Sequence, residues 1–278
     1  IASSVTTTSA SLDWTANSSE SNWEIVVQAA GTGTPAAGYG TGTAISTKPH
    51  SATSLTANTA YEYYVRADCN GDGSDLSDWA GPFAFTTLCA NETAPYTESF
   101  DASISSCWSQ SATSGGPWVL GSSVSWNTNG CGATPSDNTG NAGSFIAMDH
   151  STTPTDEAVV IEMPIVDVTA LTTPQLNFYH FMCITGITTP NQLYVEAWDG
   201  SAWNSVATIT TGAATWAEYS YVLTTHVYSG SLVKIRFRAE PGTGNVYYGD
   251  QALDDISIEE APACPSPSAM AASPIAGT

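Results

Sequence analysis

Short segments in which apolar and polar residues alternate follow one another along most of the chain, and turn residues separate them. A period of two residues is typical of a half-buried β-strand, and no long stretch carries the apolar repeat of a helix. Many short strands at regular spacing indicate a β-sandwich. In the second half of the chain we expect strands within residues 175–182, 192–198, 203–206, 216–223, 232–239 and 249–258.

The first 88 residues show the same alternation in two pairs of segments. We expect residues 11–15 and 23–27 to form two neighbouring antiparallel strands, because a Ser/Asn-rich turn separates them. A later strand begins at Tyr61, shortly after Leu55. This spacing matches a tyrosine corner, in which the tyrosine hydroxyl bonds to the backbone a few residues upstream.

The last predicted strand carries an acidic residue at an apolar position. Ala252, Ile256 and Ile258 fall on one side of an alternating strand, and Asp254 falls on that same side. Burying an unpaired carboxylate costs several kcal/mol, so we expect a cation beside it. Because the chain has only five Lys and Arg residues, a metal held by oxygen ligands is the favoured cation.

Composition narrows the possible partners and the compartment. The 26 acidic residues give a formal net charge of −21, which disfavours nucleic acid and anionic membrane surfaces as partners. No apolar run is long enough to insert into a membrane. The six cysteines lack any C-x-x-C pair, which argues for disulfides in an oxidising compartment and against zinc. We therefore expect a secreted protein, extracellular or at a cell surface.

Residues 1–88 resemble a fibronectin type III domain. Trp14 stands as its B-strand tryptophan and residues 82–87 as its last strand. The segments 23–25, 65–69 and 79–82 are similar to the version common in secreted proteins of Bacteroidetes bacteria. The resemblance implies a β-sandwich that acts as a spacer or an adhesive module, and it carries no site with it.

Four motifs follow one another within residues 89–260, namely Phe100-Asp101, Cys107-Trp108, Asp137-Asn138-Thr139 with Gly143-Ser-Phe145, and Ala252-Leu-Asp254-Asp255-Ile256. With these motifs in this order, the segment resembles a MAM domain, the jelly-roll module named for meprin, the A5 protein and receptor tyrosine phosphatase mu. The resemblance implies an all-β fold in which a fibronectin type III sandwich precedes a MAM-like jelly roll.

The jelly roll implied by this resemblance brings its first and last strands side by side, so Asp101 and Asp254 can converge. The loop 137–139 can then close over them. Oxygen ligands suit calcium (Ca2+) better than zinc. We expect a calcium site built from Asp101, Asp137, Thr139, Asp254 and Asp255. The alternative is that Asp137 only caps a turn and that Asp255 is solvated.

Two further charged segments are open to two interpretations each. The loop 68–79 imitates the first half of a calcium loop, but Trp79 stands where the bidentate Glu would be, so a solvated turn is favoured. Lys234, Arg236 and Arg238 alternate along one strand. They could bind sulfated or uronic glycans, but pairing across the sheet with acidic residues is favoured, and the candidates are Glu162, Glu196 and Glu218.

Candidate glycan-binding residues are aromatic side chains in loop-like surroundings, namely Trp126, Tyr247 and Tyr248. An enzymatic site is not expected, because the four histidines are scattered and no nucleophile motif is present. His180 lies in an apolar strand, where a core histidine with its hydrogen bonds satisfied is favoured over a metal ligand.

The MAM resemblance implies that Cys89 and Cys107 form a disulfide, since they bracket the first strand as the family's opening pair does. We pair Cys131 with Cys183 inside the same domain. Cys69 and Cys264 then remain for a disulfide between consecutive units, which requires Cα atoms within roughly 7 Å.

Residues 261–278 are rich in Pro and Ser and predict a linker that enters a following fibronectin type III-like domain. The chain is then one unit of a tandem array. The expected function is a non-catalytic extracellular adhesion or structural unit of a surface adhesin or fibre, whose partners are neighbouring copies, other surface proteins or polysaccharide. The alternative is an accessory glycan-binding region of a secreted hydrolase.

Overall fold

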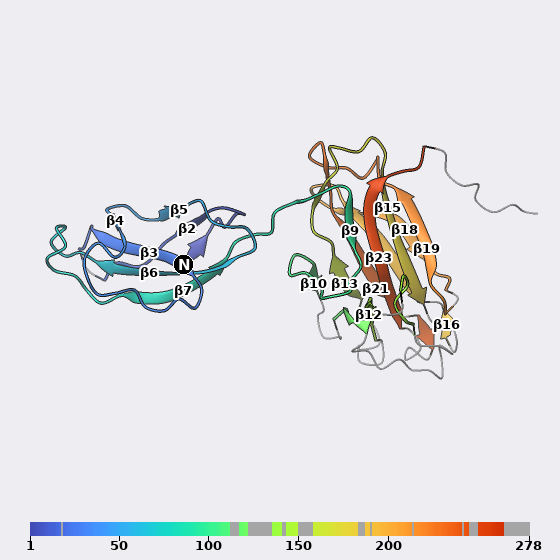
Figure 1. Cartoon of the computed structure of the whole chain (residues 1–278), viewed down its shortest axis with the longest axis horizontal. Helices are drawn as coiled ribbons and strands as arrows, with labels where there is room; N and C mark the ends of the chain where they lie inside the picture. The colour runs from blue at the N-terminus through green and yellow to red at the C-terminus, as the bar shows by residue number, and fades with distance from the viewer. Residues whose placement is uncertain are drawn as a thin grey trace, which may run out of the picture. The chain divides into compact units, whose positions relative to one another are not determined.

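The structure is a computed structural model of the 278-residue chain. It describes residues 1–17, 19–111, 117–121, 135–140, 143–149, 158–182, 187–189, 191–212, 214–240, 242–244 and 250–263. Throughout these ranges the regular structure is β-strand, so the all-β prediction is confirmed. The chain divides into two compact units, Ile1–Ala90 and Asn91–Thr278 (Figure 1).

The first unit contains a three-stranded and a four-stranded sheet. The three-stranded sheet has the order β1 (Ala2–Ser3), β2 (Ala10–Leu12), β5 (His50–Ala52). The four-stranded sheet has the order β4 (Thr43–Ile45), β3 (Trp23–Ala29), β6 (Ala60–Ala67), β7 (Ala80–Thr86).

One expectation for the first unit is wrong, because β2 and β3 do not pair with each other and belong to different sheets. The connection between them is longer than the tight turn of a hairpin, so the chain crosses from one sheet to the other. Both strands still contribute to one core, where Leu12 and Ile25 are buried with Tyr63 and Phe85. The alternating pattern of apolar and polar residues predicted where these strands lie but not which strands pair with each other.

The tyrosine corner is confirmed. The backbone N–H of Thr56 donates a hydrogen bond to the hydroxyl oxygen of Tyr61 at 2.9 Å. The ring of Tyr61 stacks on Phe85, with centroids 5.7 Å apart, at the edge of the core. The hydrogen bond and the ring contact together fix how the chain enters β6.

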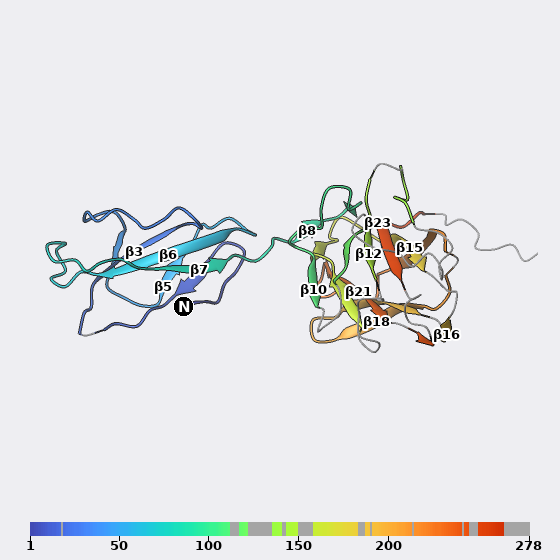
Figure 2. The same cartoon turned by 90° about the horizontal axis from the view of Figure 1, so that it is seen from below.

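The second unit is a sandwich of two larger sheets, which Figure 2 shows as layers. One sheet has the order β11 (Val119–Leu120), β12 (Ile146–Met148), β23 (Gln251–Glu260), β15 (Pro174–Met182), β19 (Ala217–Val222), and β9 (Tyr96–Glu98) also pairs with β23. The other has the order β10 (Ser109–Ser111), β13 (Val159–Glu162), β21 (Ile235–Glu240), β17 (Gln192–Trp198), β18 (Trp203–Ile209).

Two small sheets complete the second unit. One has the order β20 (Leu232–Val233), β14 (Val166–Asp167), β8 (Glu92–Thr93), and the other pairs β16 (Ile187–Thr189) with β22 (Thr243–Gly244). The main core lies between the two larger sheets, where Phe178 of β15 meets Phe237 of β21 edge to face with centroids 5.0 Å apart. Burying each such ring stabilises the fold by about 1.5–3 kcal/mol.

Strand β23 contains a bulge that the alternating pattern did not predict. On β15, Asn177 pairs with Ser257 and Tyr179 with Asp254, so β23 has one residue more than β15 between these pairs. The extra residue is Asp255, whose φ of 47° lies in the left-handed region that Asp tolerates better than most residues.

The bulge corrects the predicted faces of β23. Ile256 and Ile258 lie in the main core, whereas Ala252 belongs to a small separate cluster with Phe145, Ala147 and Phe181. Ala252 therefore does not share a face with the two isoleucines, because the extra residue shifts the alternation between them. Asp254 is buried as expected, at 0 % exposure, but it shares the face of Ala252 and not that of the two isoleucines, because it precedes the extra residue.

Candidate functional site

The opening segment of the second unit lies beside its closing strand, as expected. Strand β9 pairs antiparallel with β23, with Glu98 opposite Ile256. Phe100, which follows β9, is fully buried against Trp108 and has a φ of 57°. The next residue after this anchored turn is Asp101. Its Oδ1 accepts a hydrogen bond from the N–H of Ser144 at 3.1 Å.

The loop at residues 135–140 is fixed on the outer face of the same sheet. The indole N–H of Trp216 donates to the carbonyl of Ser136 at 2.7 Å. The N–H of Asn138 donates to Oδ2 of Asp254 at 2.9 Å, and the N–H of Gly140 donates to Oδ2 of Asp137 at 2.5 Å. These bonds place Asp137 above the closing strand.

Asp101 and Asp137 meet at Gly143. A Cβ at this glycine would lie 1.8 Å from Oδ1 of Asp101 and 2.8 Å from Oδ1 of Asp137, so both oxygens face the same side of its Cα. Oδ1 of Asp137 is buried and has no hydrogen-bond partner within the described part of the chain. A buried carboxylate oxygen without a donor is costly, and a cation is one way to satisfy it.

The carboxyl group of Asp254 has a strongly raised pKa. Burial first, and then the nearby charges of Asp255 and Asp137, raise the pKa of its carboxyl group to about 7, although the N–H groups of Asn138 and Asp255 act in the opposite direction. A carboxyl group in this position is unfavourable in its ionised form unless positive charge is close. We name Asp101, Asp137 and Asp254 the acidic cluster.

The structure separates the five expected calcium ligands into two sets. Asp101, Asp137 and Asp254 form the acidic cluster, whereas Thr139 and Asp255 contact each other at 3.5 Å beside it. Across the described residues, no group of three or more His, Cys, Asp or Glu side chains has the arrangement of a formed metal site. The acidic oxygens therefore face one region but are not gathered at ligand distances.

Hydrogen bonds and ion pairs decide between the two interpretations of the loop 68–79 and of the basic residues 234–238. The carboxylate of Asp68 accepts the N–H groups of Gly71 and Gly73 at 2.9–3.2 Å, which is the arrangement of a capped turn. Lys234, immediately before β21, pairs with Glu162 at 2.5 Å. Arg236 and Arg238 pair with Glu196 at 2.7 and 3.2 Å.

The pairing interpretation of the basic stripe is therefore confirmed for Glu162 and Glu196. Glu218 is not a partner, because it lies on β19 in the opposite sheet. His180 is a core histidine, as predicted. It is buried and its Nε2 lies 3.0 Å from Oε1 of Gln251.

Several predicted residues lie outside the described ranges, namely Trp126, Tyr247, Tyr248, Cys131, Cys183 and Cys264. Cys89 and Cys107 are each disulfide-bonded, and the pairing of one with the other stays a prediction. Cys69 is exposed and has a free thiol.

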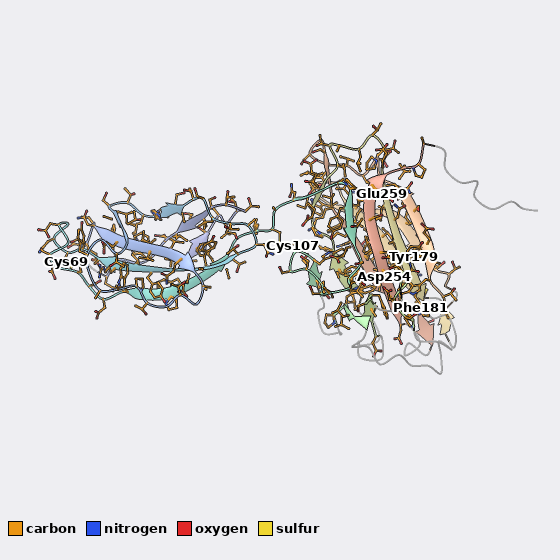
Figure 3. All side chains as sticks on the ribbon, in the orientation of Figure 1. Cys69, Cys107, Tyr179, Phe181, Asp254 and Glu259 are labelled. Atoms are coloured by element: carbon orange, nitrogen blue, oxygen red, sulfur yellow. The ribbon has the colours of Figure 1, made fainter. Side chains whose placement is uncertain are left out.

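Sequence reasoning missed a pocket on the outer face of the sheet formed by β15 and β23. Tyr179, Asp255 and Glu259 line it, and we name it the Tyr179 pocket. In Figure 3, Glu259, Tyr179, Asp254 and Phe181 follow one another along these two strands. The available signal was the polar half of the β15 alternation, in which Gln175, Asn177 and Tyr179 occupy the positions that do not face the core.

The two sheets of the second unit, with the opening segment paired to the closing strand, define a jelly-roll-like β-sandwich. The chain belongs to the MAM domain family (meprin/A5/mu), whose sequence profile matches residues 99–265. No curated protein is similar enough in sequence to count as a match. Within the described residues, no helix is long and apolar enough to span a membrane.

Solved structures with a similar arrangement include adhesin and carbohydrate-binding domains. The K3 cleaved adhesin domain of Lys-gingipain from Porphyromonas gingivalis is 15% identical, with a TM-score of 0.40 over 59% of this chain and 98% of that one. Carbohydrate-binding modules of the β-sandwich superfamily are 13% identical, with a TM-score of 0.39 over 91% and 92%. The CBM22-2 xylan-binding domain from Paenibacillus barcinonensis is 13% identical, with a TM-score of 0.37 over 59% and 98%. Similarity at this level carries no argument about function.

Proposed function

We propose that the chain is a non-catalytic extracellular unit of a bacterial surface adhesin or fibre, with a MAM domain that calcium stabilises. The acidic cluster is the observation that carries this proposal. The first unit serves as a fibronectin type III spacer in the same proposal. Its three-stranded and four-stranded sheets and its tyrosine corner support that assignment.

Calcium fits the acidic cluster better than other cations do. The donors are carboxylate oxygens and nearby backbone, without nitrogen or sulfur, and calcium takes six to eight oxygen ligands in flexible geometry. Asp101, Asp137 and Asp254 would hold the ion, and small movements of side chains would bring the oxygens to ligand distance. The ion would supply positive charge next to Asp254 and satisfy Oδ1 of Asp137.

Calorimetry with calcium and with a chelator tests the metal part of the proposal. A ligand that binds only the folded state stabilises it by about 2.7 kcal/mol at a hundred times its dissociation constant. We expect the melting temperature of the second unit to rise with calcium in the wild type. The rise should be absent in Asp254→Asn and kept in Asp199→Asn, which removes an exposed carboxylate from the β17–β18 turn. If the wild type melts at the same temperature with calcium and with chelator, the calcium site is wrong.

Adhesion itself is tested with beads coated with the full chain. We expect them to attach to surfaces that carry the same chain or a cell-surface polysaccharide in calcium, and to detach in chelator. Polysaccharide incubated with the chain should release no new reducing ends. Beads that attach to neither surface in calcium would contradict the adhesive role.

A second candidate function is an accessory region of a secreted hydrolase that binds glycan. The Tyr179 pocket is the specific observation that favours it. Sequence on either side of the chain separates the two, since further copies of the unit support the array and a catalytic domain supports the accessory role.

A further inference from the structure

The Tyr179 pocket is a concave feature that the calcium proposal does not use, with a cavity volume of about 420 Å³. This is within the range of about 300–1,000 Å³ that is usual for small-molecule sites. Its walls come from four places: the end of β9, the loop at Thr139, Tyr179 of β15, and residues 255–259 of β23. The site therefore exists only in the folded sheet.

The bulge of β23 gives the pocket its central carboxylate. Asp255 is the extra residue, and its side chain leaves the strand where its Oδ2 accepts a hydrogen bond from the amide of Asn138 at 2.8 Å. The hydroxyl of Thr139 approaches the other oxygen at 3.5 Å. Further along the face, the amide of Asn177 donates to Glu259 at 2.8 Å. Two of the acidic groups are thus held in position by neutral donors.

The charge of the pocket excludes an anionic ligand. Glu98, Asp255 and Glu259 supply three carboxylates, and no basic side chain is present among the described residues that line it. A uronic or sulfated glycan would meet like charge here. The ligand must be neutral or cationic.

The hydroxyl groups of the pocket favour a neutral ligand over a cationic peptide. Thr97, Thr139, Ser257 and Tyr179 each bring a hydroxyl, which both donates and accepts, whereas carboxylates only accept. The pKa of the Tyr179 phenol is raised by burial and by the charges of Glu218 and Asp255, so this hydroxyl keeps its proton. The hydroxyls of Thr139 and Ser257 already donate to Asp255 and Glu259, each at 3.5 Å. Lys and Arg side chains only donate, so a basic peptide would leave the hydroxyl donors of Thr97 and Tyr179 unused. Sugar hydroxyls both donate and accept, so they can bond to the hydroxyl donors of the pocket and to its carboxylate acceptors.

We propose that the Tyr179 pocket binds one neutral sugar unit of a polysaccharide, with the ring of Tyr179 against a sugar face and with Asp255 and Glu259 accepting hydrogen bonds from its hydroxyls. This inference deepens the proposed adhesive function and rests on it. Tyrosine suits the role because it offers a rigid apolar surface at low entropic cost.

Titration of the full chain with neutral hexasaccharides of glucose, xylose, mannose and galactose, followed by ligand-observed NMR, tests the proposal. We expect at least one to bind. Tyr179→Ala should weaken that binding by about tenfold or more, because central tyrosines of binding sites cost upwards of 1 kcal/mol when truncated. Tyr179→Phe keeps the ring and should weaken it by about threefold, through loss of one hydrogen bond. Asp255→Asn keeps a residue that tolerates positive φ and should also weaken binding.

Tyr39→Ala is the matched control, since Tyr39 is an exposed tyrosine of the first unit, and it should bind like the wild type. The melting temperature of each variant, measured in the same buffer, confirms that the fold is intact. Binding of polylysine without binding of any hexasaccharide would overturn the proposal in favour of a basic peptide. Sugar binding that Tyr179→Ala leaves unchanged would overturn this location, and no binding by the folded wild type would overturn the inference altogether. Bead adhesion between copies of the chain would survive each of these results, so the adhesive role is judged separately.

Discussion

At the scale of single residues, His180 and Asp254 lie on adjacent strands of one sheet, both are buried, and each avoids a buried charge by a different route. His180 stays neutral, since burial lowers its pKa to about 4 even though the hydrogen bond with Gln251 acts in the opposite direction. Asp254 has its pKa raised to about 7 by burial and sits among other carboxyl groups. The neutral His180 needs no partner from outside the chain. Asp254 would need a bound cation to be ionised at low cost.

The lowered pKa of His180 predicts a pH-dependent stability. Its ordinary pKa is 6.5, so below that pH the unfolded chain binds a proton that the folded chain excludes until about pH 4. The stabilisation from a neutral His180 is therefore present above pH 6.5 and is lost as the pH falls toward 4, by up to about 3 kcal/mol. Denaturant titrations of wild type and His180→Gln between pH 7 and 4.5 measure it. The stability advantage of the wild type should shrink as the pH falls, and a gap that stays constant would contradict this role.

Gly143 offers a test of the acidic cluster in which none of the acidic residues is mutated. Gly143→Ala puts a methyl group where Oδ1 of Asp101 lies, at 1.8 Å, so the carboxylate must move away from the cluster. We expect this variant to lose the calcium-dependent rise in melting temperature. Gly140→Ala in the same loop is the control, because its Cβ would meet Asp137 at an ordinary 3.5 Å. Equal calcium responses in the two variants would show that Asp101 is not a ligand.

At the scale of elements, alternation predicted strands well and their irregularities poorly. The segment 175–182 was expected and β15 spans Pro174–Met182, because its core-facing residues are apolar at every second position. The bulge at Asp255 was not predicted, since an extra residue leaves no mark on a two-residue period until the partner strand is known. The acidic cluster was accessible from the sequence because it follows family motifs. The Tyr179 pocket was not, because strand pairing and the bulge create it.

The basic stripe of β21 gives a prediction at this scale. Glu196 is 13% exposed and accepts hydrogen bonds from two arginines that are 21% exposed. Burial raises the pKa of Glu196, but the bonds from Arg238 and Arg236 outweigh it and leave the pKa below its ordinary value. Glu196→Gln should destabilise the second unit by about 1–3 kcal/mol, because the half-buried guanidinium of Arg236 loses its counterion and that of Arg238 keeps only Glu240.

Glu240→Gln provides the comparison for that stripe. Glu240 pairs with Arg238 alone and is 36% exposed, so its removal should cost at most about 0.5 kcal/mol. Urea denaturation of both variants measures the difference. Similar costs for the two would mean that the stripe is a solvated surface and that Glu196 has no special part in holding it.

At the scale of the whole molecule, the alternating pattern predicted the fold class and the motifs predicted the family. The motifs also predicted that the opening segment lies beside the closing strand, but not the bulge in that strand, and the alternating pattern did not predict that β2 and β3 belong to different sheets. The net charge of −21 needs screening or bound cations in whatever medium the protein meets. The five basic residues are largely occupied, since Arg66 pairs with Glu24 inside the first unit and three more form the stripe of β21. Charge attraction between copies is therefore a weak basis for an array, and a covalent link would be a stronger one.

The last prediction concerns that link. Cys69 is exposed with a free thiol, and Cys264 lies outside the described residues in the segment that we expect to enter a following unit. We predict that Cys264 of one unit forms a disulfide with Cys69 of the next, within the roughly 7 Å between Cα atoms that such a bond requires. Two copies joined in tandem, digested without reduction and mapped by mass spectrometry, should yield a peptide that contains both cysteines. Cys69→Ser should abolish that peptide and leave the disulfides of Cys89 and Cys107 intact. A peptide that links Cys69 to Cys89 or Cys131, or free thiols at both Cys69 and Cys264 in the native assembly, would refute the link.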